Sequence, residues 1–279
     1  MQRNVQYLKF KCLLLFLREI FAYAMIINEA HLLQKASKFI LNRHLGSCTI
    51  NSFFVDEPTG YERKGGDKNT LIDFCVKYQF PFAVEFVQAS IIDGKHCVEI
   101  KYQPGLLIAR ETLHFEPTDS RIFGIQTVYA NGAFNENAFL PRIVGGEGSK
   151  IDNTDAFKSA SILSLTTDFL KADVVQDVES QCALLSSDAT AFGVRGRENI
   201  IAVQMDGIKS GTTYSLPFPI QVNIHANCVS FDFYSHNKGL TDRGTELVYV
   251  DLNNEKVVRI DTLRHTLSQP AWVKQHFTT

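Results

Sequence analysis

The sequence predicts an α+β protein that consists mainly of antiparallel sheet, with helices packed on one face of the sheet. Three observations predict this class. Residues 80–102 alternate apolar and polar side chains on either side of Asp93-Gly94, as the two strands of a hairpin do. Residues 28–45 and 154–170 repeat apolar side chains at helical spacing. Strand-like segments follow each of these helical segments, so the order of helix and then meander occurs twice.

The composition is that of an ordinary globular protein. The chain has 279 residues, of which 45% are hydrophobic and 21% charged, enough for one large domain or two small ones. A net charge of −2 provides no global field, so nucleic acid could bind only through a local patch. The six cysteines form no C-x-x-C pair, which argues against a zinc site and against a disulfide-stapled secreted fold. Reduced thiols and a cytoplasmic location are therefore expected.

Residues 1–27 form an apolar N-terminal segment with several interpretations. Arg18-Glu19 divide its apolar run into two pieces, each much shorter than the ~20 residues that a membrane-spanning helix needs. We therefore expect no integral membrane insertion. Three alternatives remain for this segment: an ordinary core helix, a cleaved signal peptide, or an extension that precedes a true start at Met25 rather than Met1.

Residues 28–130 predict a first α+β half. Asn28 is a suitable N-cap for the helix, and Gly46 ends its apolar periodicity. Besides the hairpin, the pattern predicts strands at residues 48–55, 70–78, 106–115 and 122–129, with a polar, glycine-rich loop at residues 57–68. Residues 131–153 carry no periodicity and four glycines, and we interpret them as the connecting loop.

Residues 154–279 predict a second α+β half. Thr154 or Asp155 can cap a helix whose buried stripe begins at Phe157. Asp173-Val-Val-Gln matches a capping box and predicts a second helix that continues through Leu185. Strands are then predicted at residues 200–205, 214–224, 228–234, 246–252 and 257–263.

The hairpin has an echo in this second half. Leu216–Tyr234 contains PF-P-I-Q-V and C-V-S-F-D-F-Y in the same order as PF-A-V-E-F and C-V-E-I-K-Y within Phe80–Tyr102. Chance is an alternative, because strands favour few residue types. With the repeated order of elements, the echo favours two related helix-plus-meander halves. Tandem hot-dog folds and clamp-like folds are built in this way, and no motif selects either.

Glu85, Glu99 and Lys101 form the best enzymatic pattern. An acid followed on the next strand by E-x-K resembles the site of metal-dependent nucleases of the PD-(D/E)xK type. In that chemistry two carboxylates, here Glu85 and Glu99, hold Mg²⁺, and the lysine positions or activates the attacking water. Asp93 is better used in the hairpin turn. The alternative is that E-x-K lies on the solvated outer face of a sheet.

Two weaker patterns lie in the second half. Arg195 and Arg197 follow Gly193 in a turn and could contact an anionic group such as a phosphate, or could be plain surface charge. His225, Cys228, Asp232 and His236 are residue types that bind metals or form a Cys–His pair, but their spacing is also that of ordinary strand residues. Gly145–Lys150 has glycines and a lysine without the spacing of a phosphate-binding loop.

Every reactive pattern thus has a structural alternative, and the sequence favours a binding or assembly protein without an evident catalytic motif. It would act through a protein partner or self-association and needs no cofactor. The first alternative is a Mg²⁺-dependent nuclease that uses Glu85, Glu99 and Lys101. The second is a double hot-dog-like protein that binds a ligand or acts as a thioesterase, which requires a polar group at a helix end facing an apolar tunnel.

Overall fold

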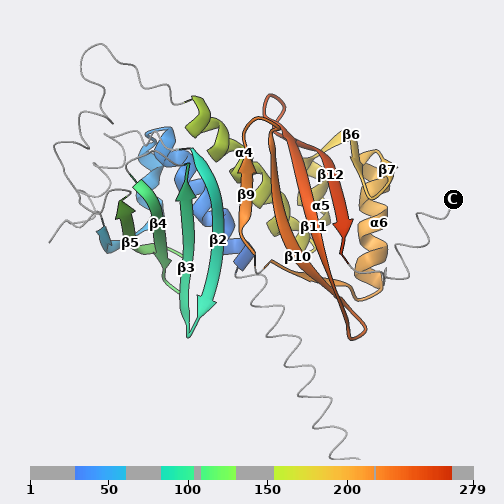
Figure 1. Ribbon diagram of the computed structural model, residues 1–279, viewed down its shortest axis with the longest axis horizontal. Helices are drawn as coiled ribbons and strands as arrows, with labels where there is room; N and C mark the ends of the chain where they lie inside the picture. The colour runs from blue at the N-terminus through green and yellow to red at the C-terminus, as the bar shows by residue number, and fades with distance from the viewer. Residues whose placement is uncertain (1–28, 61–82, 104–107, 130–153, 217, 266–279) are drawn as a thin grey trace, which may run out of the picture.

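The protein is a mixed α+β structure with one large, mostly antiparallel sheet, as the sequence predicts. The computed structural model describes residues 29–60, 83–103, 108–129, 154–216 and 218–265. Twelve strands of this part of the chain form a single sheet. Its order is β1-β5-β4-β3-β2-β9-β10-β11-β12-β6-β7, and β8 also pairs with β10 (Figure 1).

The elements fall into two runs. The first run contains a helix over residues 29–44, η1 (Cys48–Phe53), β1 (Phe54–Gly60), β2 (Val84–Ile92), β3 (Lys95–Tyr102), β4 (Ile108–Phe115) and β5 (Ile122–Tyr129). The second run contains α4 (Thr154–Val174), α5 (Val178–Leu184), β6 (Leu185–Ala191), β7 (Val194–Arg195), α6 (Arg197–Lys209), β8 (Thr213–Ser215), β9 (Ile220–Asn223), β10 (Cys228–Asn237), β11 (Leu240–Asp251) and β12 (Lys256–Arg264).

The predicted hairpin is present as β2 and β3. Asp93 and Gly94 both have positive φ angles, 51° and 74°, the conformation that a tight two-residue hairpin turn requires. The alternation buries one face of the hairpin, which includes Val87, Val98 and Ile100. The opposite face is partly exposed, so the period-two pattern corresponds to a half-buried pair of strands.

The two runs of strands join at the middle of the sheet. β2 pairs with β9 in antiparallel fashion through Phe86 with Gln221 and Val87 with Ile220, and the two strands lie side by side in Figure 1. The helix over residues 29–44 also contacts α4, where the hydroxyls of Ser37 and Thr167 are 2.6 Å apart. A single hydrophobic core therefore continues from one run into the other.

Helix α4 packs on strands of both runs. It contacts β2 of the first run as well as β9, β10, β11 and β12. Ser159 Oγ accepts a hydrogen bond from the backbone N–H of Val84 at 2.9 Å. Phe169 and Leu170 are buried near the end of the helix, and Phe157, which we expected to be buried, is 45% exposed. The last turn of α4 thus faces the sheet of the second run.

The prediction of a strand over residues 200–205 is wrong, because these residues belong to helix α6. β-branched Ile200, Ile201 and Val203 favour a strand locally. In the structure Ile200, Val203 and Gly207 are buried at helical spacing, and α6 packs on β6. Tertiary packing therefore overrides the local propensity.

Other boundaries also differ from the predicted ones. Cys48–Phe53 is a 3-10 helix, so the strand predicted from residue 48 begins at Phe54. The predicted capping box at Asp173 is wrong, because α4 continues to Val174 and Asp177 caps α5 by accepting from the N–H of Ser180. Strand β6, which pairs in parallel with β12, has no counterpart in the prediction. The strand predicted at residues 214–224 is divided into β8 and β9.

Some predictions concern residues that the structure does not describe. These predictions are the strand at residues 70–78, the connecting loop at 131–153, the N-terminal segment 1–27 and the Gly145–Lys150 loop. Within the described ranges, none of the helices combines the length and the apolar character needed to cross a bilayer.

Candidate functional site

The structure divides the three residues of the nuclease hypothesis between two ion pairs. Lys101 Nζ lies 2.9 Å from Glu85 Oε1, and both side chains are about two-fifths exposed, at 43% and 38%. Glu99 instead pairs with Arg110, at 3.3 Å. Across the described part of the chain, no group of three or more His, Cys, Asp and Glu side chains is arranged to hold a metal ion.

The two arginines of the predicted anion contact have different partners. Arg195 Nη2 lies 3.8 Å from Asp188 Oδ2, and both side chains are largely exposed. Arg197 Nη1 donates to the backbone carbonyl of Cys182 at 3.3 Å. The structure therefore does not direct the two guanidinium groups toward a common point.

The cluster around His225 is dispersed along the β9–β10 hairpin. His236 contacts the hydroxyls of Ser215 and Thr241, at 3.2 and 3.0 Å. Asp232 accepts hydrogen bonds from Arg243 and Thr245 on the neighbouring strand. These contacts are those of polar residues that pair across strands.

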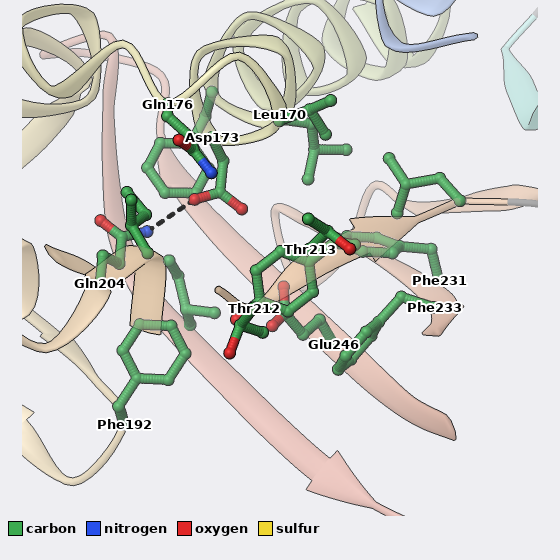
Figure 2. A pocket seen from close by; sticks show the side chains of 16 residues that line it. Leu170, Asp173, Gln176, Phe192, Gln204, Thr212, Thr213, Phe231, Phe233 and Glu246 are labelled. Carbon is green, nitrogen blue, oxygen red and sulfur yellow. Dashed lines mark hydrogen bonds between the residues drawn. The ribbon is translucent and has the colours of Figure 1, made fainter. Parts of the chain in front are cut away.

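A cavity that the sequence did not reveal lies between helices α4 and α6 and the sheet of the second run (Figure 2). Its volume is about 40 Å³, room for roughly three water-sized groups. The lining is mostly apolar and includes Phe169, Leu170, Val174, Phe192, Ile208, Leu216, Phe231, Phe233 and Ile260. An apolar lining with a few polar groups is a feature of small-molecule sites, and the space here holds a small group rather than a drug-sized ligand.

Asp173 brings a carboxylate into this cavity from the last turn of α4. Burial raises the pKa of Asp173 to about 7. Gln204 Nε2 of α6 donates to Asp173 Oδ1 at 3.0 Å, the dashed contact in Figure 2, and Gln181 Nε2 lies 3.4 Å from the same oxygen. The Gln204 Oε1 atom is buried without a hydrogen-bond partner. These amides orient Asp173 without supplying a positive charge.

Glu246 brings a second carboxylate, from strand β11 on the other side of the cavity (Figure 2). Burial and then the charge of Asp173 raise the pKa of Glu246 to about 7, against the opposing effect of Arg264. Thr262 Oγ1 donates to Glu246 Oε1 at 3.3 Å. The charge of Asp173 therefore acts on Glu246 across the cavity, whereas burial alone raises the pKa of Asp173.

Two further polar side chains border the carboxyl pair. Burial, followed by the charges of Asp173 and Glu246, raises the pKa of Tyr214, so its phenol stays neutral at ordinary pH. Arg264 donates to Ser235 Oγ at 2.6 Å, and its guanidinium carbon lies 5.1 Å from the centre of the Phe233 ring. Near neutral pH the pair can exchange protons, accept hydrogen bonds or hold a positive charge.

The first run contains a buried polar cluster of a different kind. Arg43, near the end of the helix over residues 29–44, donates to Glu111 Oε2 of β4 at 3.0 Å and to the hydroxyl of Tyr102 at 2.6 Å. Tyr102 Oη donates to the same Glu111 oxygen at 2.6 Å. The Arg43 and Glu111 side chains are fully buried, so each charge is compensated inside the protein.

Sequence reasoning missed the carboxyl pair because its members come from distant elements. Asp173 was assigned to a helix cap, and Glu246 to the start of a strand. One local signal was available. Glu246 lies two and four residues before the buried Val248 and Val250, so it is on the same face of β11. A carboxylate on the inward face of a strand indicates a buried charge that needs a partner.

Comparison with known proteins gives little. No family model and no curated protein matches the sequence. Among solved structures, a protein of unknown function with a cystatin-like fold from Methylobium petroleophilum PM1 is similar at 14% identity and a TM-score of 0.35, over 40% of this chain and 80% of that one. Bd1075 of Bdellovibrio bacteriovorus is similar at 11% identity and a TM-score of 0.32, over 67% of this chain and 77% of that one. Likenesses this weak bear on neither the fold nor the function.

Proposed function

We propose that this chain is a ligand-binding protein built from two related helix-plus-meander halves, with the helices on one face of the shared sheet and the binding site in the second half. The observation that carries the proposal is the apolar cavity with Asp173 and Glu246 in its wall. A cytoplasmic location, which the scattered cysteines favour, belongs to the same proposal.

The register of the outer strands supports the relation between the halves. β1 pairs in parallel with β5 through Phe54 with Ile122 and then, after an irregularity, Thr59 with Gly124. β6 pairs in parallel with β12 through Leu185 with Val257 and then Thr190 with Arg259. In both pairs the first strand advances five residues while its partner advances two, so the same irregularity occurs twice.

A second irregularity falls at matching places. The pairing of β4 with β5 shifts between His114 and Phe115, and that of β11 with β12 shifts between Tyr249 and Val250. Bulges of this kind are specific features of a fold rather than defects. Two matching irregularities support descent of both halves from one unit more strongly than the short residue echo does.

The helices give a third correspondence. Ser37 and Thr167, whose hydroxyls touch, are 130 residues apart. At this spacing six buried residues of the first helix correspond to six buried residues of α4. The pairs are Ala30 and Ala160, Leu32 and Ile162, Leu33 and Leu163, Ala36 and Thr166, Phe39 and Phe169, and Ile40 and Leu170. The two helices thus bury the same face and cross at corresponding positions, as a two-fold relation requires.

The binding assignment depends on the chemistry of the cavity. The double hot-dog alternative asked for a polar group at a helix end that faces an apolar space, and Asp173 occupies such a position at the end of α4. A mostly apolar wall removes ligand surface from water, and the carboxyl groups fix the ligand's orientation. Both features favour binding of a small molecule over assembly alone.

Fragment binding with a blocked cavity tests the proposal. The probes are butyl and benzyl compounds that carry a cationic, neutral or anionic head, and ligand-observed NMR measures their binding. Ile208 lines the cavity, so Ile208→Trp should weaken whichever fragment binds. Ile92→Trp is the matched control, because Ile92 is 65% exposed at the hairpin turn. The proposal is wrong if no fragment binds, or if Ile208→Trp binds all of them as well as the control does.

A further inference from the structure

The correspondence between the halves places three pairs of residues at equivalent positions. Glu111 lies three residues before the irregularity at His114, and Glu246 lies three residues before the one at Tyr249. Ile100 pairs with Glu111 and Phe231 pairs with Glu246, so Tyr102 of β3 corresponds to Phe233 of β10. At the helical spacing of 130 residues, Arg43 corresponds to Asp173.

The strand between the halves agrees with this assignment. Val87 of β2 pairs with Ile100, and Ile220 lies opposite Phe231 when the β9–β10 register is continued by one residue. Val87 and Ile220 are therefore equivalent, and they pair directly with each other at the centre of the sheet. The PF part of the sequence echo aligns Val84 with Ile220 and is three residues out of this register, whereas the C-V-E-I-K-Y part agrees with it. Equivalent residues that meet in this way lie on the two-fold axis between the halves.

The inward glutamate of each half, Glu111 or Glu246, has different partners in the two halves. In the first half the guanidinium of Arg43 and the hydroxyl of Tyr102 both bond to Glu111, and the cluster is buried. In the second half the helix presents the carboxylate of Asp173 in place of a guanidinium, and Phe233 has no hydroxyl. The cavity of the second half is lined by Asp173, Phe233 and Glu246, which are the counterparts of the three residues that form the buried cluster of the first half.

We infer that the cavity binds a small organic cation, a guanidinium or a primary ammonium group on an apolar substituent, whose charged group takes the place that Arg43 occupies in the first half. This inference rests on the proposed binding function. The cavity has room for about three water-sized groups, which matches a cationic head group. The aromatic ring of Phe231 in the wall favours a cation over an anion, and the Phe233 ring already lies against the guanidinium of Arg264.

The charges that face the site are consistent with a monocation. Asp173 and Glu246 contribute two negative charges when ionised, and Arg264 contributes one positive charge while it is engaged with Ser235. Tyr214 stays neutral because its pKa is raised. The net charge of −1 at the site favours one bound positive charge. Binding should tighten between pH 6 and 8, because Asp173 and Glu246 lose their protons over this range.

The test compares butylguanidinium with N-butylurea, a neutral molecule of nearly the same shape. Isothermal titration and amide NMR should show butylguanidinium binding more tightly than the urea. Glu246→Gln and Asp173→Asn, which change charge and hardly change volume, should each weaken it by about tenfold or more, since hydrogen bonds to charged groups are the strong ones. Glu179→Gln, at an exposed position on α5, is the matched control and should bind as the wild type does.

A second variant converts the second half to the arrangement of the first. Asp173→Arg together with Phe233→Tyr should fill the cavity with an internal guanidinium, abolish binding of butylguanidinium and raise the urea midpoint of unfolding. The inference is overturned if this double variant still binds the cation, or if Glu246→Gln and Asp173→Asn bind it as tightly as the wild type. If N-butylurea or an anionic fragment binds in the cavity and butylguanidinium does not, the cation assignment is overturned and the proposed binding function stays intact.

Discussion

Replacing Glu246 by glutamine should stabilise the protein above neutral pH. Burial and the charge of Asp173 raise the pKa of Glu246 from 4.5 to about 7, so the folded state holds its proton more tightly than the unfolded chain does. Between these pH values the folded state binds more protons, and its free energy of unfolding falls as the pH rises. The Glu246 carboxylate therefore costs folding free energy at pH 8 and almost none at pH 4.

The size of the effect follows from the shift. A shift of about 2.5 pKa units at 1.36 kcal/mol each amounts to about 3 kcal/mol when fully developed. Asp173 contributes to the shift and is itself raised from 3.8 to about 7, so the two residues are coupled and their effects do not add. We therefore expect Glu246→Gln to gain about 1–3 kcal/mol relative to the wild type at pH 8, and little at pH 5.

Urea unfolding followed by circular dichroism at pH 5, 6, 7 and 8 measures this difference. The wild type should lose stability over this range, and Glu246→Gln should lose less. Glu179→Gln, at an exposed carboxylate on α5, should follow the wild type at every pH. If the curves for the wild type and Glu246→Gln stay parallel from pH 5 to 8, Glu246 titrates alike in the folded and unfolded states, and the prediction is wrong.

Three further predictions concern the rest of the sheet. Arg43→Met should lose about 3–5 kcal/mol in urea unfolding, because it leaves the buried Glu111 charge uncompensated; a loss below about 1 kcal/mol would contradict the buried ion pair. Gly244→Ala should lose about 1–3 kcal/mol, since its Cβ would lie 2.6 Å from the buried Phe233 ring; thermal unfolding measures this, and an unchanged midpoint would show that the ring moves freely. Lys101→Ala should change stability by less than about 1 kcal/mol, because both side chains of its ion pair are about two-fifths exposed; Mg²⁺-dependent DNA cleavage by the wild type that this variant abolishes would instead establish the nuclease alternative.

Features that depend on neighbouring residues could be predicted from the amino-acid sequence. The turn at Asp93-Gly94 follows from the positive φ angles that these two residue types tolerate. The helices and most meander strands follow from the spacing of apolar side chains, because a helix or strand at the edge of a core must present one apolar face. The α+β class with a mostly antiparallel sheet could therefore be predicted.

Which elements meet could not be predicted from local sequence, because it depends on long-range packing. The parallel strands β1 and β6 pair with strands far away in the chain, and periodicity specifies a buried face without naming its partner. The helical state of residues 200–205 comes from packing on β6 against a β-branched local preference. The raised pKa values of Asp173 and Glu246 arise because elements far apart in the chain surround the two carboxyl groups with mostly apolar side chains and remove part of the water that would stabilise their charges.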